Sequence, residues 1–158
     1  MIGIAMAFVV RCLLVGLFLP FSALDKILNF KAAVVQCAQS VSNRALATVF
    51  IASGFAVEVL MSAAILAGIM DRLAALILAM YCIATALLWK QFWRTPDFRL
   101  KGASTGREML WDFLKNFALA GGFLLLTFGT NAAGVMHFVQ YPLASSHPYA
   151  QREATDGR

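Results

Sequence analysis

The sequence predicts an all-α membrane protein, a bundle of four transmembrane helices with a short interfacial helix between the first and the second. Three observations lead to this fold class. Of the 158 residues, 61% are hydrophobic, against roughly 45–50% in soluble proteins. Only 13% are charged, and the mean hydropathy is +0.76. The apolar residues also gather in four long segments. A soluble domain of this size could not cover its surface with so few charges.

Each apolar segment is close to the roughly 20 residues that a membrane-crossing helix needs. The segments run from about Ile2 to Leu24, Ala45 to Met70, Leu73 to Trp89 and Trp111 to Phe138. Together they predict a single transmembrane domain at residues 1–141, followed by a soluble C-terminal tail at residues 142–158. We expect the first segment to be a span rather than a signal peptide, because it lacks a basic start and carries Arg11 inside its apolar run.

The connection between the first two spans, residues 25–44, has an amphipathic pattern. Apolar residues recur there at helical spacing, while asparagine and glutamine fall between them. This pattern predicts a short amphipathic helix that lies in the membrane interface. The later connection, Lys90–Arg107, is polar and contains Pro96, Gly102 and Gly106, which indicates an aqueous loop.

The distribution of basic residues predicts the orientation. The two long connections hold eight lysines and arginines, against three on the opposite side: Lys26, Lys31, Arg44, Lys90, Arg94, Arg99, Lys101 and Arg107, against Arg72, Arg152 and Arg158. Because basic loops stay on the cytoplasmic side, both long connections are predicted to be cytoplasmic and both termini external.

Two charges lie inside spans, Arg11 and Glu58. Arg11 precedes Asp25 by 14 residues and Glu58 follows Arg44 by the same number, so each lies about 21 Å from the cytoplasmic helix end. We therefore expect the two at equal depth, as an ion pair that removes an insertion cost of about 2.5–3.5 kcal/mol each. Two interpretations stay open: a structural staple between helices, or a polar pocket for a head group, a quinone or a proton.

A second polar group is predicted at the cytoplasmic end of the bundle. Four of its residues line one face of the fourth span, and two more leave the first span at the same level: Glu108, Asp112, Lys115 and Asn116, then Asp25 and Lys26. We expect Lys115 to pair with Asp112 or Asp25. The group is either an interfacial network with snorkelling lysines or the floor of a site for an anionic or quinone-like ligand.

The sequence shows no motif for a resident cofactor or for catalysis. Cys12, Cys37 and Cys82 form no C-x-x-C pair and are expected to be apolar thiols. His137 and His147 lie at a span end and in the tail, where neither predicts haem ligation within the bundle. No basic run of five residues occurs, so nucleic acid is not an expected partner.

Three segments carry a family resemblance. Arg11-Cys-Leu-Leu-Val-Gly-Leu-Phe, continuing to Ser22-Ala-Leu-Asp-Lys26, resembles the beginning of DoxX-like proteins, which have an arginine in helix one and a small-x-x-Lys at its end. Ala-Ser-Gly54-Phe-Ala-Val-Glu58 is similar to their second helix. Phe113-Leu-Lys115-Asn116-Phe-Ala-Leu-Ala-Gly121-Gly122 is similar to their last helix and is the most specific part. The resemblance covers roughly residues 5–130, and Ala23 departs from it where the family often has glycine.

The resemblance implies a four-helix protein of the bacterial inner membrane. Some DoxX-like proteins are the membrane subunit of a thiosulfate:quinone oxidoreductase, and others accompany thiol-redox systems. It therefore implies a redox-associated subunit without a cofactor of its own, with a quinone as the candidate ligand. Its partners would be the lipid bilayer, other membrane or redox proteins and, as an open alternative, further copies of itself. The candidate ligand-binding residues are Arg11, Asp25, Lys26, Glu58, Asp112, Lys115 and Asn116.

Two other functions stay open. The chain could be a non-catalytic accessory protein that packs against a larger membrane complex, a role that suits the featureless third span. It could also be a transporter, although four spans are few for one chain and no inverted repeat is visible.

Overall fold

The structure, a computed structural model, describes residues 1–41 and 43–150, and this part of the chain is helical without strands. The helices are α1 (Ile2–Val15), α2 (Ala23–Leu28), α3 (Phe30–Val41), α4 (Arg44–Ala67), α5 (Asp71–Trp89), α6 (Thr105–Phe128) and α7 (Ala132–Gln140), with the short turns η1 (Leu17–Ser22) and η2 (Phe92–Arg94). Four helical segments are long and apolar enough to cross a membrane: Ile2–Leu28, Arg44–Ala67, Asp71–Arg94 and Thr105–Phe128. The prediction of an all-α chain with four helices able to cross a membrane is confirmed for the described residues.

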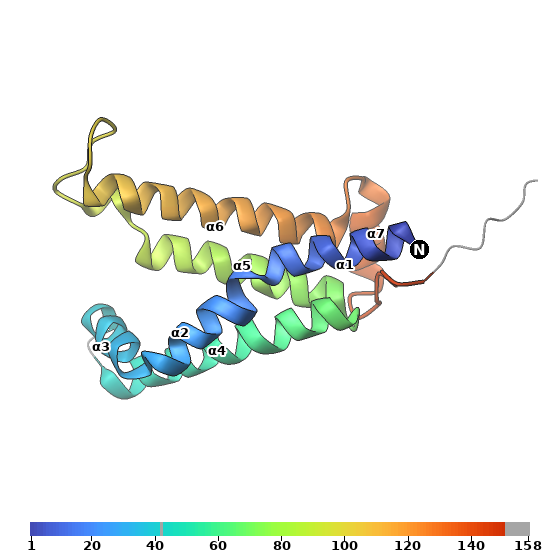
Figure 1. Cartoon of the computed structure of the whole chain (residues 1–158), viewed down its shortest axis with the longest axis horizontal. Coiled ribbons are helices and arrows are strands. Elements are labelled where there is room, and N and C mark those ends of the chain that lie inside the picture. The colour runs from blue at the N-terminus through green and yellow to red at the C-terminus, as the bar shows by residue number, and fades with distance from the viewer. Residues whose placement is uncertain (42, 151–158) are drawn as a thin grey trace, which may run out of the picture.

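The long helices meet around one apolar core (Figure 1). α5 packs between α4 and α6, and α1 contacts both α4 and α6. Val15 and Phe18 from the first span meet the inward faces of the other three, which contribute Ile65, Leu78 and Phe123. Many large apolar side chains elsewhere on the helices stay exposed, as expected for helices that face lipid.

The first span is longer than predicted and is not a regular α-helix. It continues past Leu24 to Leu28, and its middle, Leu17–Ser22, is a π-helical turn that contains Pro20. Proline has no N–H to donate and its ring clashes with the carbonyl one turn earlier, so a helix commonly adjusts its winding there. The adjustment sets how Lys26, beyond the turn, is oriented relative to Arg11, before it.

A helix forms in the connection after the first span, but its apolar face is covered by protein. Val34 and Cys37 of α3 are buried against Ala47 of α4. A helix lying flat in the interface would bury that face among lipids instead. The interfacial position of α3 therefore stays a prediction.

The fourth span was predicted as one segment from Trp111 to Phe138, which is wrong at both ends. α6 begins earlier, at Thr105, and ends at Phe128, and α7 is a separate helix. Gly129 has a φ of 70° and Asn131 caps α7 by accepting a hydrogen bond from the Gly134 amide at 2.8 Å. Hydropathy missed this turn because Asn131 is the one strongly polar residue among the glycines, alanines and threonine of residues 129–134.

Two polar side chains build the early start of α6. The Ser104 hydroxyl accepts a hydrogen bond from the Arg107 amide at 3.1 Å. Asp97, from the preceding loop, accepts from the amides of Thr105 at 2.7 Å and Gly106 at 3.2 Å. These bonds, above all the one from Thr105, hold the pKa of the Asp97 carboxyl below its usual range. The helix start is therefore fixed by a residue eight positions upstream.

Candidate functional site

The buried charges lie in two separate clusters, and the predicted pair between Arg11 and Glu58 is wrong. Arg11 forms an ion pair with Asp71, with Nη2 2.7 Å from Oδ2. Glu58 forms an ion pair with Lys26, with Nζ 2.8 Å from Oε1. Each charge therefore has its own partner on a different helix.

The error came from the assumed levels of the helix ends. Arg11 also donates from Nη1 to the carbonyl oxygen of Ile65 at 3.2 Å, so it lies seven residues beyond Glu58 along α4. The prediction placed Asp25 and Arg44 at one level. Instead α3, which is 12 residues and about 18 Å long, packs against α4 between these two points. As a result the end of the first span, with Lys26, lies level with the middle of α4.

The Glu58 cluster consists of Ser22, Lys26, Glu58 and Tyr81. Lys26 Nζ lies 2.8 Å from both carboxylate oxygens of Glu58 and also donates to Ser22 Oγ at 2.8 Å. Ser22 Oγ donates to Glu58 Oε2 at 3.0 Å, and the Tyr81 hydroxyl donates to Oε1 at 2.8 Å. Three side chains from the first span and α5 thus converge on one carboxylate of α4.

The local sequence explains why these groups meet. Ser22 and Lys26 are one helical turn apart, so both face α4. Gly54 lies one turn before Glu58, and a Cβ added there would come within 3.1 Å of the Tyr81 hydroxyl oxygen. The absence of a side chain at Gly54 therefore lets Tyr81 reach the carboxylate.

The cluster combines two opposite charges with two hydroxyl groups in a largely water-free place. Glu58 is 2% exposed, whereas the Lys26 side chain is 15% exposed. A carboxylate, an ammonium and a phenol joined by hydrogen bonds can exchange a proton among themselves or donate to a ligand oxygen. These are the chemical abilities that a site for a polar head group requires.

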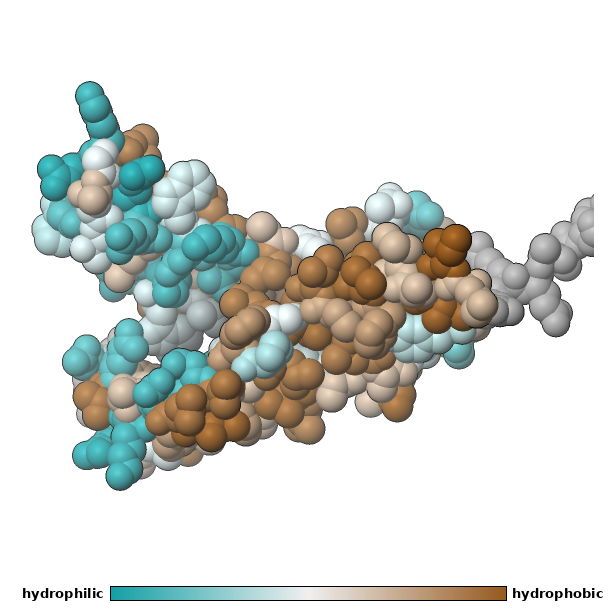
Figure 2. Space-filling model, in the orientation of Figure 1, coloured by the Kyte–Doolittle hydropathy of each residue, from teal (hydrophilic) through white to brown (hydrophobic). Residues whose placement is uncertain are grey.

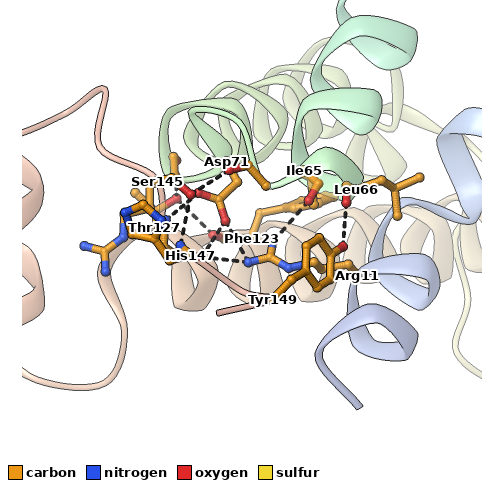
Figure 3. Close-up of polar contacts among 12 residues, drawn as sticks. Arg11, Ile65, Leu66, Asp71, Phe123, Thr127, Ser145, His147 and Tyr149 are labelled. Carbon is orange, nitrogen blue, oxygen red and sulfur yellow. Dashed lines mark hydrogen bonds and ion pairs between the residues drawn. The ribbon is translucent and has the colours of Figure 1, made fainter. Parts of the chain in front are cut away.

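The Asp71 cluster consists of Arg11, Asp71 and Ser146 and lies in the region shown in Figure 3. Ser146 belongs to the C-terminal segment, residues 141–150, which follows α7. Arg11 Nη2 donates to Ser146 Oγ at 2.8 Å as well as to Asp71. The Ser146 amide donates to Asp71 Oδ1 at 2.8 Å, and its hydroxyl donates to Oδ2. Both terminal nitrogens of Arg11 and both carboxylate oxygens of Asp71 therefore have hydrogen-bond partners, as a buried ion pair needs.

The C-terminal segment also clamps the turn between α4 and α5. Ser145 Oγ donates to the Gly68 carbonyl at 2.6 Å, and the Tyr149 hydroxyl donates to the Leu66 carbonyl (Figure 3). Gly68 has a φ of 70°, and a Cβ there would lie 2.9 Å from the Pro148 ring. The predicted tail thus packs against the bundle as far as Tyr149, while residues 151–158 lie outside the described residues.

The third polar group is more open. Asp112 pairs with Lys90 at 2.9 Å and with Lys115 at 3.4 Å, and its backbone carbonyl accepts from Asn116 Nδ2 at 2.9 Å. Lys115 therefore pairs with Asp112, which is one of its two predicted partners. Asp25 accepts from Asn29 Nδ2 at 2.8 Å instead. No hydrogen bond or ion pair between the described residues links this group to the Glu58 cluster.

A hollow separates two lobes at the end of the molecule that carries the long connections (Figure 2). Comparison with Figure 1 assigns α2, α3 and the start of α4 to one lobe, and the loop after α5 with the start of α6 to the other. Hydrophilic residues line both sides of the hollow (Figure 2). A polar ligand can therefore enter between the two lobes from this end of the bundle.

Sequence reasoning missed several partners, namely Ser22, Asp71, Tyr81, Lys90 and Ser146. A signal for Asp71 existed: it is the acidic residue of the short turn after the second span, on the same side of the bundle as the start of the helix that holds Arg11. A signal for Tyr81 was its place within a span, because a buried tyrosine hydroxyl usually finds an acceptor. Nothing in the sequence indicated that Ser146 returns to the bundle.

The cysteines are free, and Cys37 and Cys82 are buried. Within residues 1–41 and 43–150, no group of three or more histidine, cysteine or acidic side chains could hold a metal ion.

Comparison with known protein families, curated proteins and solved structures finds no match to this chain. The relationship to DoxX-like proteins therefore remains a proposal that depends on the residues quoted for it.

Proposed function

We propose that this chain is a DoxX-like membrane subunit of the bacterial inner membrane that binds a quinone head group at the Glu58 cluster. The observation that carries the proposal is the convergence of Lys26, Ser22 and Tyr81 on Glu58, with donor–acceptor distances of 2.8–3.0 Å in the middle of a span. Intramembrane ionisable groups of this kind are expensive to insert, and functional sites are where they are usually kept. The proposal places the long connections in the cytoplasm.

The chemistry of a quinone fits the surroundings of this cluster. Its two carbonyl oxygens accept hydrogen bonds, which Lys26 can donate and which Tyr81 can donate once its hydroxyl turns from Glu58 to the quinone, and its tail is apolar. Phe21, Leu24 and Leu28 are exposed on the same segment as Lys26 and offer an apolar surface for such a tail. Reduction to the quinol needs two electrons and two protons. A dithiol of a partner protein supplies both when it becomes a disulfide, and the Glu58 cluster relays the protons.

The test is to purify the protein in a mild detergent, identify co-purified quinone by mass spectrometry and titrate a short-chain benzoquinone. Glu58→Gln removes a charged hydrogen-bond partner and should weaken quinone binding by about tenfold or more. Glu108→Gln is the matched control, because it makes the same substitution at an exposed glutamate whose side chain forms no hydrogen bond or ion pair with another described residue, and it should leave quinone binding unchanged. The proposal fails if no quinone co-purifies and Glu58→Gln does not alter binding.

A second function, a non-catalytic accessory subunit, is favoured by the pairing within the Glu58 cluster. Both carboxylate oxygens already accept hydrogen bonds from this chain, as they would in a structural staple. A stoichiometric partner recovered in a native pull-down, without quinone, would support this function. A monomer without a partner would count against it.

A further inference from the structure

The loop between α5 and α6 is held in shape by packed aromatic rings. Phe92 of η2 contacts Trp93, Phe98 and Phe113, with ring centroids 5.0, 5.5 and 5.5 Å apart. Trp93 also packs edge-on against Phe113 at 5.7 Å. Arg107 closes the other side of the loop by donating to the Gly102 carbonyl at 3.1 Å. The packed rings and this hydrogen bond therefore fix the shape of the loop and the positions of its remaining side chains.

This loop carries exposed basic side chains. Arg94, Arg99 and Lys101 are exposed, and none takes part in an ion pair with another described residue. Asp97, the acidic residue of the loop, accepts the two amide hydrogen bonds that begin α6 and so faces the helix start. The positive charge of the loop is thus left uncompensated by the loop itself.

Each of these basic residues directly follows an exposed apolar one. Trp93 is 51% exposed before Arg94, Phe98 is 41% exposed before Arg99, and Leu100 is 71% exposed before Lys101. Alternating apolar and basic side chains suit the boundary between acyl chains and anionic head groups. We call these six residues the loop platform.

The position of the loop platform decides which partner it fits. The candidate spans on either side end at Arg94 and begin again at Thr105, so the ten residues between them are tied to the membrane surface at both ends. Lipid head groups are therefore always within reach, and their concentration there exceeds that of any soluble acidic partner. Charge complementarity then favours the anionic head groups over the neutral ones.

We propose that the loop platform binds the head groups of anionic phospholipids in the leaflet at this end of the bundle. Arg94, Arg99 and Lys101 contact the phosphates, while Trp93, Phe98 and Leu100 insert at the level of the glycerol and upper acyl chain. This site is distinct from the Glu58 cluster, so it does not depend on the proposed quinone binding.

The test compares phosphatidylglycerol with phosphatidylcholine of the same acyl chains, added to the full-length protein in detergent and counted by native mass spectrometry. The wild type should retain phosphatidylglycerol preferentially, and the preference should decline as salt increases. Arg99→Gln with Lys101→Gln should weaken phosphatidylglycerol binding by about tenfold. Lys31→Gln with Arg44→Gln is the matched control, since it removes two exposed charges from the other long connection.

The outcomes separate a site from a general charge effect. Loss of phosphatidylglycerol preference in the loop variant, with the control variant within twofold of wild type, supports the proposal. Equal loss in both variants shows only diffuse attraction and overturns it. Equal retention of the two lipids by the wild type also overturns it, as does an unchanged preference in the loop variant. Because all four substituted side chains are exposed, circular dichroism should show the same helix content in both variants.

Discussion

Arg11 Nη2 lies 2.7 Å from Asp71 Oδ2, so the arginine inside the first span is paired with the first residue of α5. Both side chains are almost completely buried. Glu58, the other charge within a span, is neutralised separately by Lys26. The two pairs fix different levels of the bundle: one joins α1 to the start of α5, and the other joins α2 to the middle of α4. Removing a partner from either should therefore affect stability independently of the other.

Removal of the Asp71 carboxylate should be strongly destabilising. Asp71→Asn leaves the Arg11 guanidinium without a counter-charge, and breaking a buried pair in this way costs about 3–5 kcal/mol. Reversible unfolding in mixed micelles with increasing denaturing detergent measures this free energy. A double-mutant cycle adds the decisive comparison. Arg11→Met should couple strongly to Asp71→Asn and near zero to Glu58→Gln, and strong coupling to Glu58 would contradict the structure.

Tyr81 and Gly54 should show an energetic coupling in the Glu58 cluster. Tyr81→Phe removes one donor to the carboxylate and should lower stability by about 1–3 kcal/mol. Gly54→Ala would place a Cβ 3.1 Å from the Tyr81 hydroxyl oxygen and push it away from Glu58. In the Tyr81→Phe background that oxygen is absent, so Gly54→Ala should cost clearly less. Unfolding of the four variants measures the difference, and additive effects would refute the close contact.

The C-terminal segment should contribute to the stability of the bundle through Ser146. Ser146→Ala removes a hydroxyl that contacts both Arg11 and Asp71, for an expected loss of about 1–3 kcal/mol. His147→Asn is the control, because the histidine side chain is exposed and asparagine tolerates its φ of 49°. If both variants melt at the wild-type temperature, the segment does not clamp the helices. Limited proteolysis of the segment after Gln140 measures independently whether that segment detaches from the bundle.

The fold was predictable from the sequence to the extent that hydropathy determines it. Long apolar runs specify four candidate spans, because a segment within the bilayer must make all its backbone hydrogen bonds internally and does so as a helix. Hydropathy does not register the break after Phe128, since a single strongly polar residue, Asn131, stands there among small, weakly polar ones. It also does not reveal that α3 packs along α4, and this one contact shifted the depth of Glu58 relative to Arg11. The positions of buried charges along helices were thus predicted better than their partners.

The candidate site illustrates the same limit. Lys26 and Glu58 were both selected as candidate ligand residues, and the structure brings them together. Their link depends on the level at which two distant helices pack, which residue spacing within either helix does not determine. Ser22 and Tyr81 are neutral, so charge counting passed over them. Ser146 belongs to a segment whose polar composition predicts solvent, and it is the unmet hydrogen-bonding demand of Arg11 and Asp71 that explains its return to the bundle.

Asp97 should make the stability of the start of α6 dependent on pH. Its pKa is lowered in the folded protein by the amide hydrogen bonds of Thr105 and Gly106. A carboxyl whose pKa is lower when folded stabilises the protein above its unfolded pKa, about 3.9, and loses that contribution as the pH falls through its folded pKa. Asp97→Asn should therefore lower the melting temperature at pH 7, and the difference from wild type should shrink below pH 4. Glu108→Gln removes a charge from the same helix turn but no hydrogen bond of the described structure, so its effect at pH 7 should be smaller. Thermal unfolding from pH 7 to pH 3 in one detergent measures all three curves. A difference between Asp97→Asn and wild type that stays constant over this range would show that the lowered pKa does not contribute to stability.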